Sequence, residues 1–151
     1  MRFVIQVVSS ADVKIDNRVA GSINKGFMVL VGVGQGDDEQ IADKMVSKLL
    51  GLRIFPDENG KTNLSLSDVN GELLMVSQFT LYADCKKGNR PSFIKAGDPA
   101  HAEELYEYVI KSCRDILGAE NVGTGTFGAD MKCTIINDGP FTIDLDSDEL
   151  K

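Results

Sequence analysis

Phe27-Met28-Val29-Leu30-Val31 is an uninterrupted apolar run, and the rest of the predicted architecture can be arranged around it. Such a short run between turn signals is typical of a strand buried on both faces. A second run covers residues 72–81, after an Asn70-Gly71 pair that is typical of a hairpin. The two runs predict the centre of a sheet.

Shorter segments surround this centre and end at turn residues. Two helices are predicted, one capped by Asp37 and Asp38, and one over 99–117 that begins after Asp98. Their apolar stripes are Ile41, Met45, Leu49 and Leu52 in the first helix, and Ala102, Leu105, Val109, Cys113 and Ile116 in the second. The remaining predicted strands are 3–8, 12–16, 18–23, 52–55, 132–136 and 141–145. This pattern predicts an α+β fold with two or three helices and a mainly antiparallel, barrel-like sheet.

Length and charge limit the possible functions. The 151 residues contain no repeat or linker, so residues 1–151 are predicted to form a single domain. Sixteen Lys and Arg against 23 Asp and Glu give a net charge of −7, which excludes nucleic-acid binding by the whole surface but allows a local basic patch. No membrane-spanning run or signal peptide is recognised, so a cytoplasmic location is predicted.

No metal or organic cofactor is predicted. The three cysteines lack metal-ligand spacing, and the lone histidine, His101, is expected in the solvated first turn of a helix. Residues 123–128 match G-x-G-x-x-G, but a helix end precedes them and a strand follows, which is the wrong context for a dinucleotide site. The glycine-rich turn 32–36 is followed by three acidic residues that would repel a phosphate.

Three segments carry residues that folding alone does not require. Ser77-Gln78-Phe79-Thr80 places hydroxyls and an amide at the end of an apolar strand. Segment 137–142 combines Asn, Asp, Gly, Pro, Phe and Thr. Segment 85–95 holds four of the basic residues without an acid, so it suits a phosphate backbone, with Phe93 available for stacking. Taken singly, the three are also consistent with a strand end, a turn and a solvated loop.

Together these segments resemble the D-aminoacyl-tRNA deacylase family over essentially the whole chain. Ser77-Gln78-Phe79-Thr80 matches its S-Q-F-T motif, and Asn137, Gly139, Pro140 and Thr142 match N-x-G-P-x-T. Segments 87–93 and 126–131 also resemble family sequence. Four ordered motifs are a far stronger signal than any one of them.

The resemblance implies a homodimer that hydrolyses the ester between a D-amino acid, or mischarged glycine, and the 3′ adenosine of tRNA. This is a chiral proofreading step in translation quality control. The ester would lie near Ser77 to Thr80, and Gly139-Pro140 would form a cis peptide inserted into the partner's pocket. The other implied contacts are Phe127 and Met131 with the adenine, Asn137 and Thr142 in the substrate-binding loop, and Lys86, Lys87 and Arg90 with the tRNA backbone.

The chemistry expected of these residues is specific. A Gly-Pro unit offers main-chain carbonyls to an α-ammonium and a wall against an L side chain. The backbone N–H groups of Phe79 and Thr80 suit an oxyanion, while Thr80 is either a nucleophile or, with Gln78, a positioning group for water assisted by the substrate 2′-OH. Val7 stands where family members commonly carry an Arg thought to hold the Gly-Pro loop, and Phe141 stands where valine is common.

Two other functions remain open at this stage. One is a non-catalytic RNA-binding module that uses the basic segment, and the other is a hydrolase of small D-amino acid esters, which needs no basic patch. Replacement of Lys86, Lys87 and Arg90 together distinguishes them, because only the tRNA-dependent functions would be lost.

Overall fold

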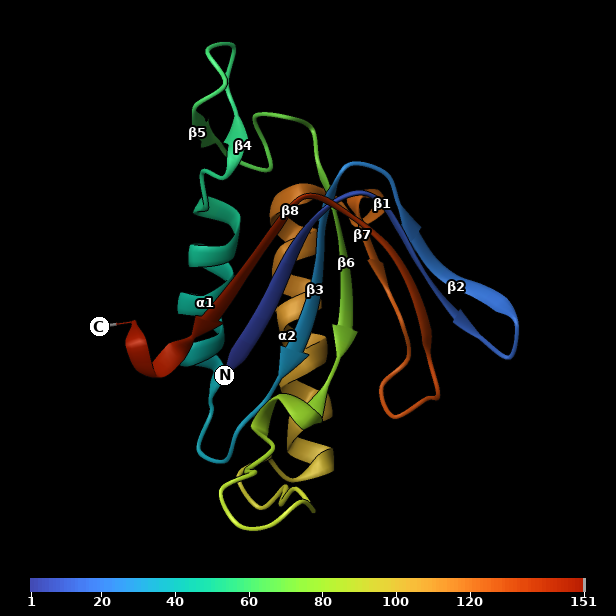
Figure 1. Ribbon diagram of the computed structural model, residues 1–151, viewed down its shortest axis with the longest axis vertical. Helices are drawn as coiled ribbons and strands as arrows, with labels where there is room; N and C mark the ends of the chain where they lie inside the picture. The colour runs from blue at the N-terminus through green and yellow to red at the C-terminus, as the bar shows by residue number, and fades with distance from the viewer. Residues whose placement is uncertain (151) are drawn as a thin grey trace.

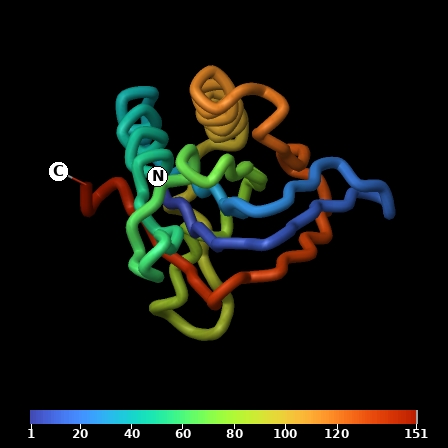
Figure 2. The backbone as a smooth tube through the Cα atoms, turned by 90° about the horizontal axis from the view of Figure 1, so that it is seen from above, coloured from blue at the N-terminus to red at the C-terminus, as the bar shows by residue number. Residues whose placement is uncertain are grey.

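The computed structural model describes residues 1–150 as two α-helices that cover one face of a strongly bent sheet (Figure 1). Helices α1 (Glu39–Gly51) and α2 (Pro99–Leu117) lie side by side on the same side of the first strand (Figure 2). Neither helix in this part of the chain is long and apolar enough to cross a membrane. The predicted α+β fold with a barrel-like sheet is confirmed.

Strand β1 (Arg2–Ile15) organises the sheet because it has partners along both edges. Along one edge it pairs antiparallel with β8 (Lys132–Asp146). Its other edge is shared by β3 (Gly26–Gly32), opposite the first half, and β2 (Arg18–Ile23), opposite the second half. The sequence predicted two strands in each of the 3–16 and 132–145 regions. Each pair is instead one continuous, bent strand.

The bend in β1 and β8 divides the sheet into two arms. Register shifts occur between Gln6 and Val8 and between Val8 and Ser10 of β1, where the two strands turn (Figure 1). Apolar side chains fill the space between the arms and form a core separate from the one beneath the helices. This second core comprises Val8, Ala11, Val13, Ile23, Met28, Leu74 and Val76. The bend therefore lets one sheet enclose its own apolar interior, like a barrel.

The centre of the sheet is parallel, which the sequence did not predict. Strand β6 (Glu72–Ser77) pairs in parallel with β3, and β7 (Val122–Thr124) pairs in parallel with β6 and also contacts β2. The turn at Asn70 has a left-handed φ of 52°, but it leads into β6 after a crossover through α1. The predicted hairpin is wrong because β6 pairs with β3, in which each partner lies 46 residues earlier, rather than with its immediate predecessor.

The second apolar run is shorter as a strand than predicted. β6 ends at Ser77, and residues Phe79–Tyr82 form the 3₁₀ helix η1. The predicted strand 52–55 is reduced to β4 (Phe55–Pro56), which pairs with β5 (Thr62–Leu64) in a small hairpin. Two further 3₁₀ turns, η2 (Ala119–Asn121) and η3 (Ser147–Glu149), precede β7 and follow β8.

Both helices are confirmed, with changes in their details. Asp38 caps α1, since its carboxylate accepts a hydrogen bond from Ile41 N–H at 2.9 Å. The side chain of Asp98, predicted to cap α2, makes no such bond. On α2 the predicted stripe member Ile116 is 64% exposed, and Tyr106 is buried instead. The other four predicted stripe residues, Ala102, Leu105, Val109 and Cys113, are buried as expected.

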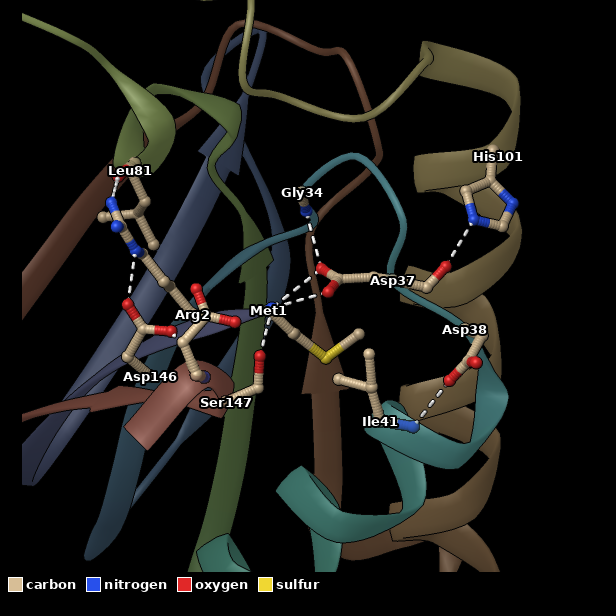
Figure 3. Close-up of polar contacts among 11 residues, drawn as sticks. Met1, Arg2, Gly34, Asp37, Asp38, Ile41, Leu81, His101, Asp146 and Ser147 are labelled. Atoms are coloured by element: carbon tan, nitrogen blue, oxygen red, sulfur yellow. Dashed lines mark hydrogen bonds and ion pairs between the residues drawn. The ribbon is translucent and has the colours of Figure 1, made fainter. Parts of the chain in front are cut away.

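Asp37 does not cap α1 but turns into the molecule, where it is buried (Figure 3). Its carboxylate accepts hydrogen bonds from the Met1 ammonium group at 2.8 Å and from Gly34 N–H at 2.7 Å. Its carbonyl accepts a bond from the ring of His101, which is otherwise exposed at the start of α2 as predicted. The glycine-rich turn is thus occupied by the protein's own carboxylate.

Candidate active site

A cavity of about 320 Å³ lies where the parallel strands β3 and β6 end. Residues at these strand ends form one wall, and α2 with the loop after β7 forms the opposite one. The carboxyl ends of adjacent parallel strands are a common place for ligand sites, because loops diverge there. The lining residues are Val31, Val33, Val76, Ser77, Gln78, Phe79, Ala102, Tyr106, Phe127, Gly128, Ala129, Asp130, Met131 and Cys133.

The Ser77-Gln78-Phe79-Thr80 segment forms the polar side of this cavity. Its first three residues line the space, whereas Thr80 is exposed and does not. Gln78 N–H donates to the Val31 carbonyl at 2.7 Å, so the strand register extends into the site. The Gln78 side-chain amide donates to the Thr80 hydroxyl. This hydrogen bond therefore fixes the orientation of both the Gln78 and the Thr80 side chains.

The backbone geometry at η1 leaves two donors available. The first hydrogen bond of this turn runs from Leu81 N–H to the Gln78 carbonyl at 3.3 Å. Phe79 N–H and Thr80 N–H precede it and have no acceptor inside the turn, as is usual for the first residues of a helix. Two adjacent unpaired N–H groups, the first on a residue that lines the cavity, are the arrangement that an oxyanion needs.

Arg2 fixes the far end of η1, a contact that the sequence did not predict. Its guanidinium donates to the Leu81 carbonyl at 2.8 Å and to Asp146 at 2.9 Å (Figure 3). It also lies over the Tyr82 ring, 4.7 Å from the centroid. On the other side, Gly34 approaches this ring so closely that a Cβ there would lie 2.7 Å from it. The turn that carries the donors is held on two sides.

The apolar side of the cavity contains both residues implied as adenine contacts, Phe127 and Met131. Phe127 lies 6.0 Å from the ring of Tyr106, and the buried Tyr106 hydroxyl donates to the Met75 carbonyl at 2.8 Å. Burial raises the pKa of Tyr106, so the hydroxyl stays protonated as a structural donor. The structure thus brings together Ser77, Gln78, Phe79, Phe127 and Met131.

Two cavity residues, Tyr106 and Cys133, were missed by sequence reasoning. Tyr106 lies among the apolar residues of α2, and only its hydroxyl group could have indicated from sequence that it has a polar role. Cys133 was expected to be an incidental thiol, but it lines the cavity. Burial, with a further contribution from the Asp12 carboxylate, raises the pKa of its thiol above the usual range. The thiol is therefore a neutral lining group.

The Gly-Pro loop, residues 138–141, is a bulge in β8. Gln6 pairs with Thr142 and Val8 pairs with Asn137, so the whole loop stands opposite Val7 alone. The Asn137 side chain closes its base: its Oδ1 accepts from Phe141 N–H at 2.9 Å, and its Nδ2 donates to Thr142 Oγ1 at 3.0 Å. The Gly139–Pro140 peptide is cis, as the resemblance implies. Val7 stands where family members commonly carry an Arg, and its side chain is buried in the core. The loop is held instead by the side chain of Asn137.

The structure does not bring this loop to the cavity of the same chain. Asn137 lies level with Val8, Gly26 and Glu72 across the sheet, at the bend, whereas the cavity begins at Ser77. Five residues of β6 separate the two levels, or roughly 17 Å at the usual rise of a strand. Figure 1 shows the bend of β8 and the end of β6 at opposite ends of the sheet. None of residues 137–142 lines the cavity.

The predicted phosphate contacts Lys86, Lys87 and Arg90 are exposed on a loop that begins just after η1. They lie outside the cavity, and Lys86 lines a separate hollow with Arg2 and Tyr82. Phe93, on the returning part of the loop, contacts Phe79 edge to face, with ring centroids 5.1 Å apart. The basic segment is thus continuous with the mouth of the cavity.

Other parts of the surface do not compete with this site. A more open hollow of about 740 Å³ lies between α1 and the residues after β8, but charged side chains and glycine dominate its lining. In residues 1–150, no three His, Cys, Asp or Glu side chains gather closely enough to hold a metal ion. The cavity at the strand ends instead combines the Phe79, Tyr106 and Phe127 rings with the Ser77 hydroxyl and the Gln78 amide.

Comparison with known proteins agrees with the motifs. The family described as "D-Tyr-tRNA(Tyr) deacylase" matches residues 4–146. The chain belongs to this family. A D-aminoacyl-tRNA deacylase of Clostridium tetani is 53% identical over 147 residues, which cover 97% of both chains. A D-aminoacyl-tRNA deacylase of Lactobacillus acidophilus is 55% identical over 146 residues, which cover 97% of this chain and 99% of the relative.

Solved structures of similar chains confirm the deacylase fold. A protein described as "c-Myc DNA Unwinding Element Binding Protein" superposes with a TM-score of 0.92 at 39% identity, covering 97% of this chain and 98% of that one. A probable eukaryotic D-amino acid tRNA deacylase superposes with a TM-score of 0.82 at 18% identity, over 95% and 97% of the two chains. One of the two similar structures is therefore described as a DNA-element-binding protein.

Proposed function

We propose that this chain hydrolyses the ester between a D-amino acid, or mischarged glycine, and the 3′ adenosine of tRNA. The observation that carries the proposal is a single cavity lined by Phe79, whose backbone N–H is unpaired, together with Phe127 and Met131; the unpaired Thr80 N–H is the next donor along the chain. Membership of the deacylase family supports the same reaction. The activity removes D-residues before translation, and we expect it in the cytoplasm from residues 1–151 acting as one domain.

The reaction needs little from side chains. An aminoacyl ester is already reactive, so stabilisation of the tetrahedral oxyanion is the main requirement, and loss of one such donor costs about 2.7 to 4 kcal/mol in other enzymes. Phe79 N–H and Thr80 N–H supply two donors on a turn that Arg2 fixes. A water assisted by the substrate 2′-OH is the attacking group. No His or Lys lines the cavity, and its one carboxylate, Asp130, is 89% exposed and paired with Lys132 at 3.0 Å, so no side chain there is placed to activate Thr80.

The proposed adenosine subsite is the apolar wall. Phe127 and Met131 offer a ring face and a polarisable thioether to the adenine, and Tyr106 supports Phe127 from beneath. The amino acid would then extend toward Ser77 and the η1 donors. A cavity of about 320 Å³ suits an adenosine with a small or partly exposed aminoacyl group.

Selection of the D form requires a wall that this cavity lacks in one chain. We propose that the Gly-Pro loop of a second copy supplies it in a homodimer, with main-chain carbonyls that accept the α-ammonium and exclude an L side chain. The position of the loop at the bend, roughly 17 Å from Ser77 along the strands, supports action across subunits rather than within one. The clamp by Asn137 and Thr142 supports a rigid loop.

The first experiment measures release of amino acid from matched D-Tyr-tRNA and L-Tyr-tRNA by the purified, chelator-treated protein. We expect rapid loss of the D ester while the L ester persists at its spontaneous rate. Cleavage of both esters at similar rates would remove the chiral wall from the proposal. Persistence of both, with no activity restored by added divalent metal, would contradict the hydrolase.

A second candidate function is a nucleic-acid-binding module. The exposed Lys86, Lys87 and Arg90 favour it, as does the description of one similar structure as a DNA-element-binding protein. Replacement of the three cations together by Gln distinguishes the two. Loss of RNA binding in a protein that never hydrolyses a D ester would favour the module. Loss of tRNA hydrolysis with retained cleavage of a small D-Tyr ester would favour the deacylase.

A further inference from the structure

An exposed aromatic pair beside the cavity has no role in the chemistry described above. The Phe79 ring is 54% exposed and the Phe93 ring is 38% exposed, and they meet at an interplanar angle of 70°. Single exposed apolar residues are common on proteins and need no explanation. Two rings in contact at the mouth of a site are different, because they offer a stacking surface to a flat ligand.

The backbone around Phe93 is fixed before any ligand binds. Asp84 and Ser92 exchange two backbone hydrogen bonds, of 2.7 and 2.9 Å, which close the base of the loop. Beyond Phe93, Gln35 N–H donates to the Lys95 carbonyl at 3.1 Å, and Gly97 N–H donates to the Val33 carbonyl at 2.9 Å. A preorganised ring loses little conformational entropy when it binds a partner.

The same loop carries unneutralised positive charge. Within residues 1–150, no carboxylate lies within 4.0 Å of the side-chain nitrogens of Lys86, Lys87 or Arg90. The neighbouring acid, Asp84, is paired with Lys95 at 3.3 Å. In a chain of net charge −7, three free cations next to an aromatic pair indicate a polyanion with flat rings, which is a single-stranded nucleic acid.

We propose that Phe79 and Phe93 bind the base of the unpaired nucleotide that immediately precedes the terminal adenosine, and that Lys86, Lys87 and Arg90 bind the phosphates beyond it. This inference rests on the proposed function, because it takes the terminal adenosine to be in the cavity. The order of features supports it. Phe79 lines the cavity, Phe93 contacts Phe79, and the cations lie on the loop between Asp84 and Ser92, just before Phe93. Stacking accepts any base, which suits an enzyme that acts on many tRNAs.

A double-mutant cycle between protein and RNA tests the stacking directly. The probe is a fluorescent, uncharged RNA hairpin with an unpaired CCA 3′ tail, compared with the same hairpin abasic at the penultimate nucleotide. Phe93→Ala and the abasic change should each weaken binding about tenfold, within the range of base–aromatic stacking. Together they should weaken it about tenfold and not a hundredfold, because both remove the same contact. Phe93→Trp should restore binding to the intact hairpin.

Ile94→Ala is the matched control, because Ile94 is the neighbouring apolar residue, is 78% exposed and makes no aromatic contact. It should change binding less than twofold. Additive losses in the cycle, or no loss with Phe93→Ala, would overturn the inference. So would a change of sedimentation coefficient with Phe93→Ala, because the pair would then be covered by a second copy of the chain.

The readout separates this inference from the proposed function. Binding of an uncharged hairpin needs no hydrolysis, whereas the deacylase is tested with D-Tyr-tRNA and the minimal ester D-Tyr-adenosine. A protein that cleaves both esters but shows no coupling in the cycle retains the function and loses the stacking site. A protein that shows the coupling but cleaves neither ester retains the stacking site and loses the deacylase. With both present, Phe93→Ala should reduce kcat/KM at least fivefold more on D-Tyr-tRNA than on D-Tyr-adenosine.

Discussion

The two motif regions of this chain are held in opposite ways. The segment from Ser77 to Thr80 continues a central strand and is fixed by the Val31 carbonyl, by Arg2 and by the close approach of Gly34. The Gly-Pro loop protrudes from an edge strand and is held at its base by the side chain of Asn137. The first region is a site within one chain, whereas the second is presented outward.

This difference has a physical basis. Stabilisation of an oxyanion needs donors that do not reorganise, and a strand end inside a sheet provides them. A chiral wall must approach the substrate from outside the pocket, and a bulge on an edge strand can reach a neighbouring molecule without disturbing its own sheet. In the proposed homodimer, one chain would supply the donors and its partner the Gly-Pro loop.

The largest expected effect is the loss of activity in two single variants, which a mixture of the two should partly reverse. Gly139→Val breaks the loop, because a Cβ at its left-handed φ of 135° would lie 3.0 Å from Phe141 N. Cys133→Trp fills the cavity and leaves the loop intact. Each alone should lower D-Tyr-tRNA hydrolysis by about a hundredfold or more, in line with the loss of a positioning element.

Random reassociation of these two variants should restore about a quarter of wild-type activity, because half of the dimers would contain one intact pocket facing one intact loop. The measurement is the initial rate after subunit exchange, with each variant mixed with itself as the control. An active Gly139→Val protein, or a mixture that stays inactive although exchange is shown by mass spectrometry, would contradict action across subunits.

Asn137 is expected to control selectivity rather than rate. Asn137→Ala removes both hydrogen bonds at the base of the loop, so the preference for the D over the L ester should fall about tenfold, at a cost of about 1 kcal/mol in stability. Thr142→Val removes only the bond to the hydroxyl and should have a smaller effect, whereas Thr142→Ser should have none. The ratio of kcat/KM for D-Tyr-tRNA and L-Tyr-tRNA measures this. An unchanged ratio in Asn137→Ala would show that the dimer, and not this clamp, fixes the loop.

Arg2 provides the corresponding test at the other region. Arg2→Met should lower kcat about fivefold with KM unchanged, because η1 loses the contact with the Leu81 carbonyl and its donors become mobile. Arg2→Lys should not restore the rate, since an ammonium cannot contact Leu81, Asp146 and the Tyr82 ring together. Lys48→Met, an exposed charge on α1, is the control. A rise in KM alone would place Arg2 in binding of the RNA.

The smallest effect is expected from Thr80→Ala. Thr80 is exposed, does not line the cavity and is bonded to Gln78, so a positioning role should cost less than threefold in kcat. Single-turnover hydrolysis of D-Tyr-tRNA measures it, with Ser77→Ala for comparison inside the cavity. Complete loss of turnover with unchanged RNA binding would instead establish Thr80 as the nucleophile.

The helices and the buried strand 27–31 followed from sequence alone, because apolar spacing reports burial directly. The parallel pairing of β3 with β6 did not, because a strand's own sequence says nothing about which strand lies beside it. The turn at Asn70 was recognised but read as a hairpin for this reason. The bend that merges the predicted strand pairs also escaped notice, since a bulge changes pairing without changing the apolar pattern.

For the site, the sequence supplied the candidate residues: the basic loop followed from its charge, whereas the roles of the two motifs and the adenine contacts followed from the family resemblance. Only the tertiary structure decided which of them meet. Ser77, Phe79, Phe127 and Met131 converge because β6, η1 and the loop after β7 end at one side of the sheet, and Tyr106 and Cys133 join them from α2 and β8. Gly139 and Pro140 stay apart because the bend in β8 carries them to the opposite end, and their distance from Ser77 is set by the pairing of strands that are far apart in the sequence.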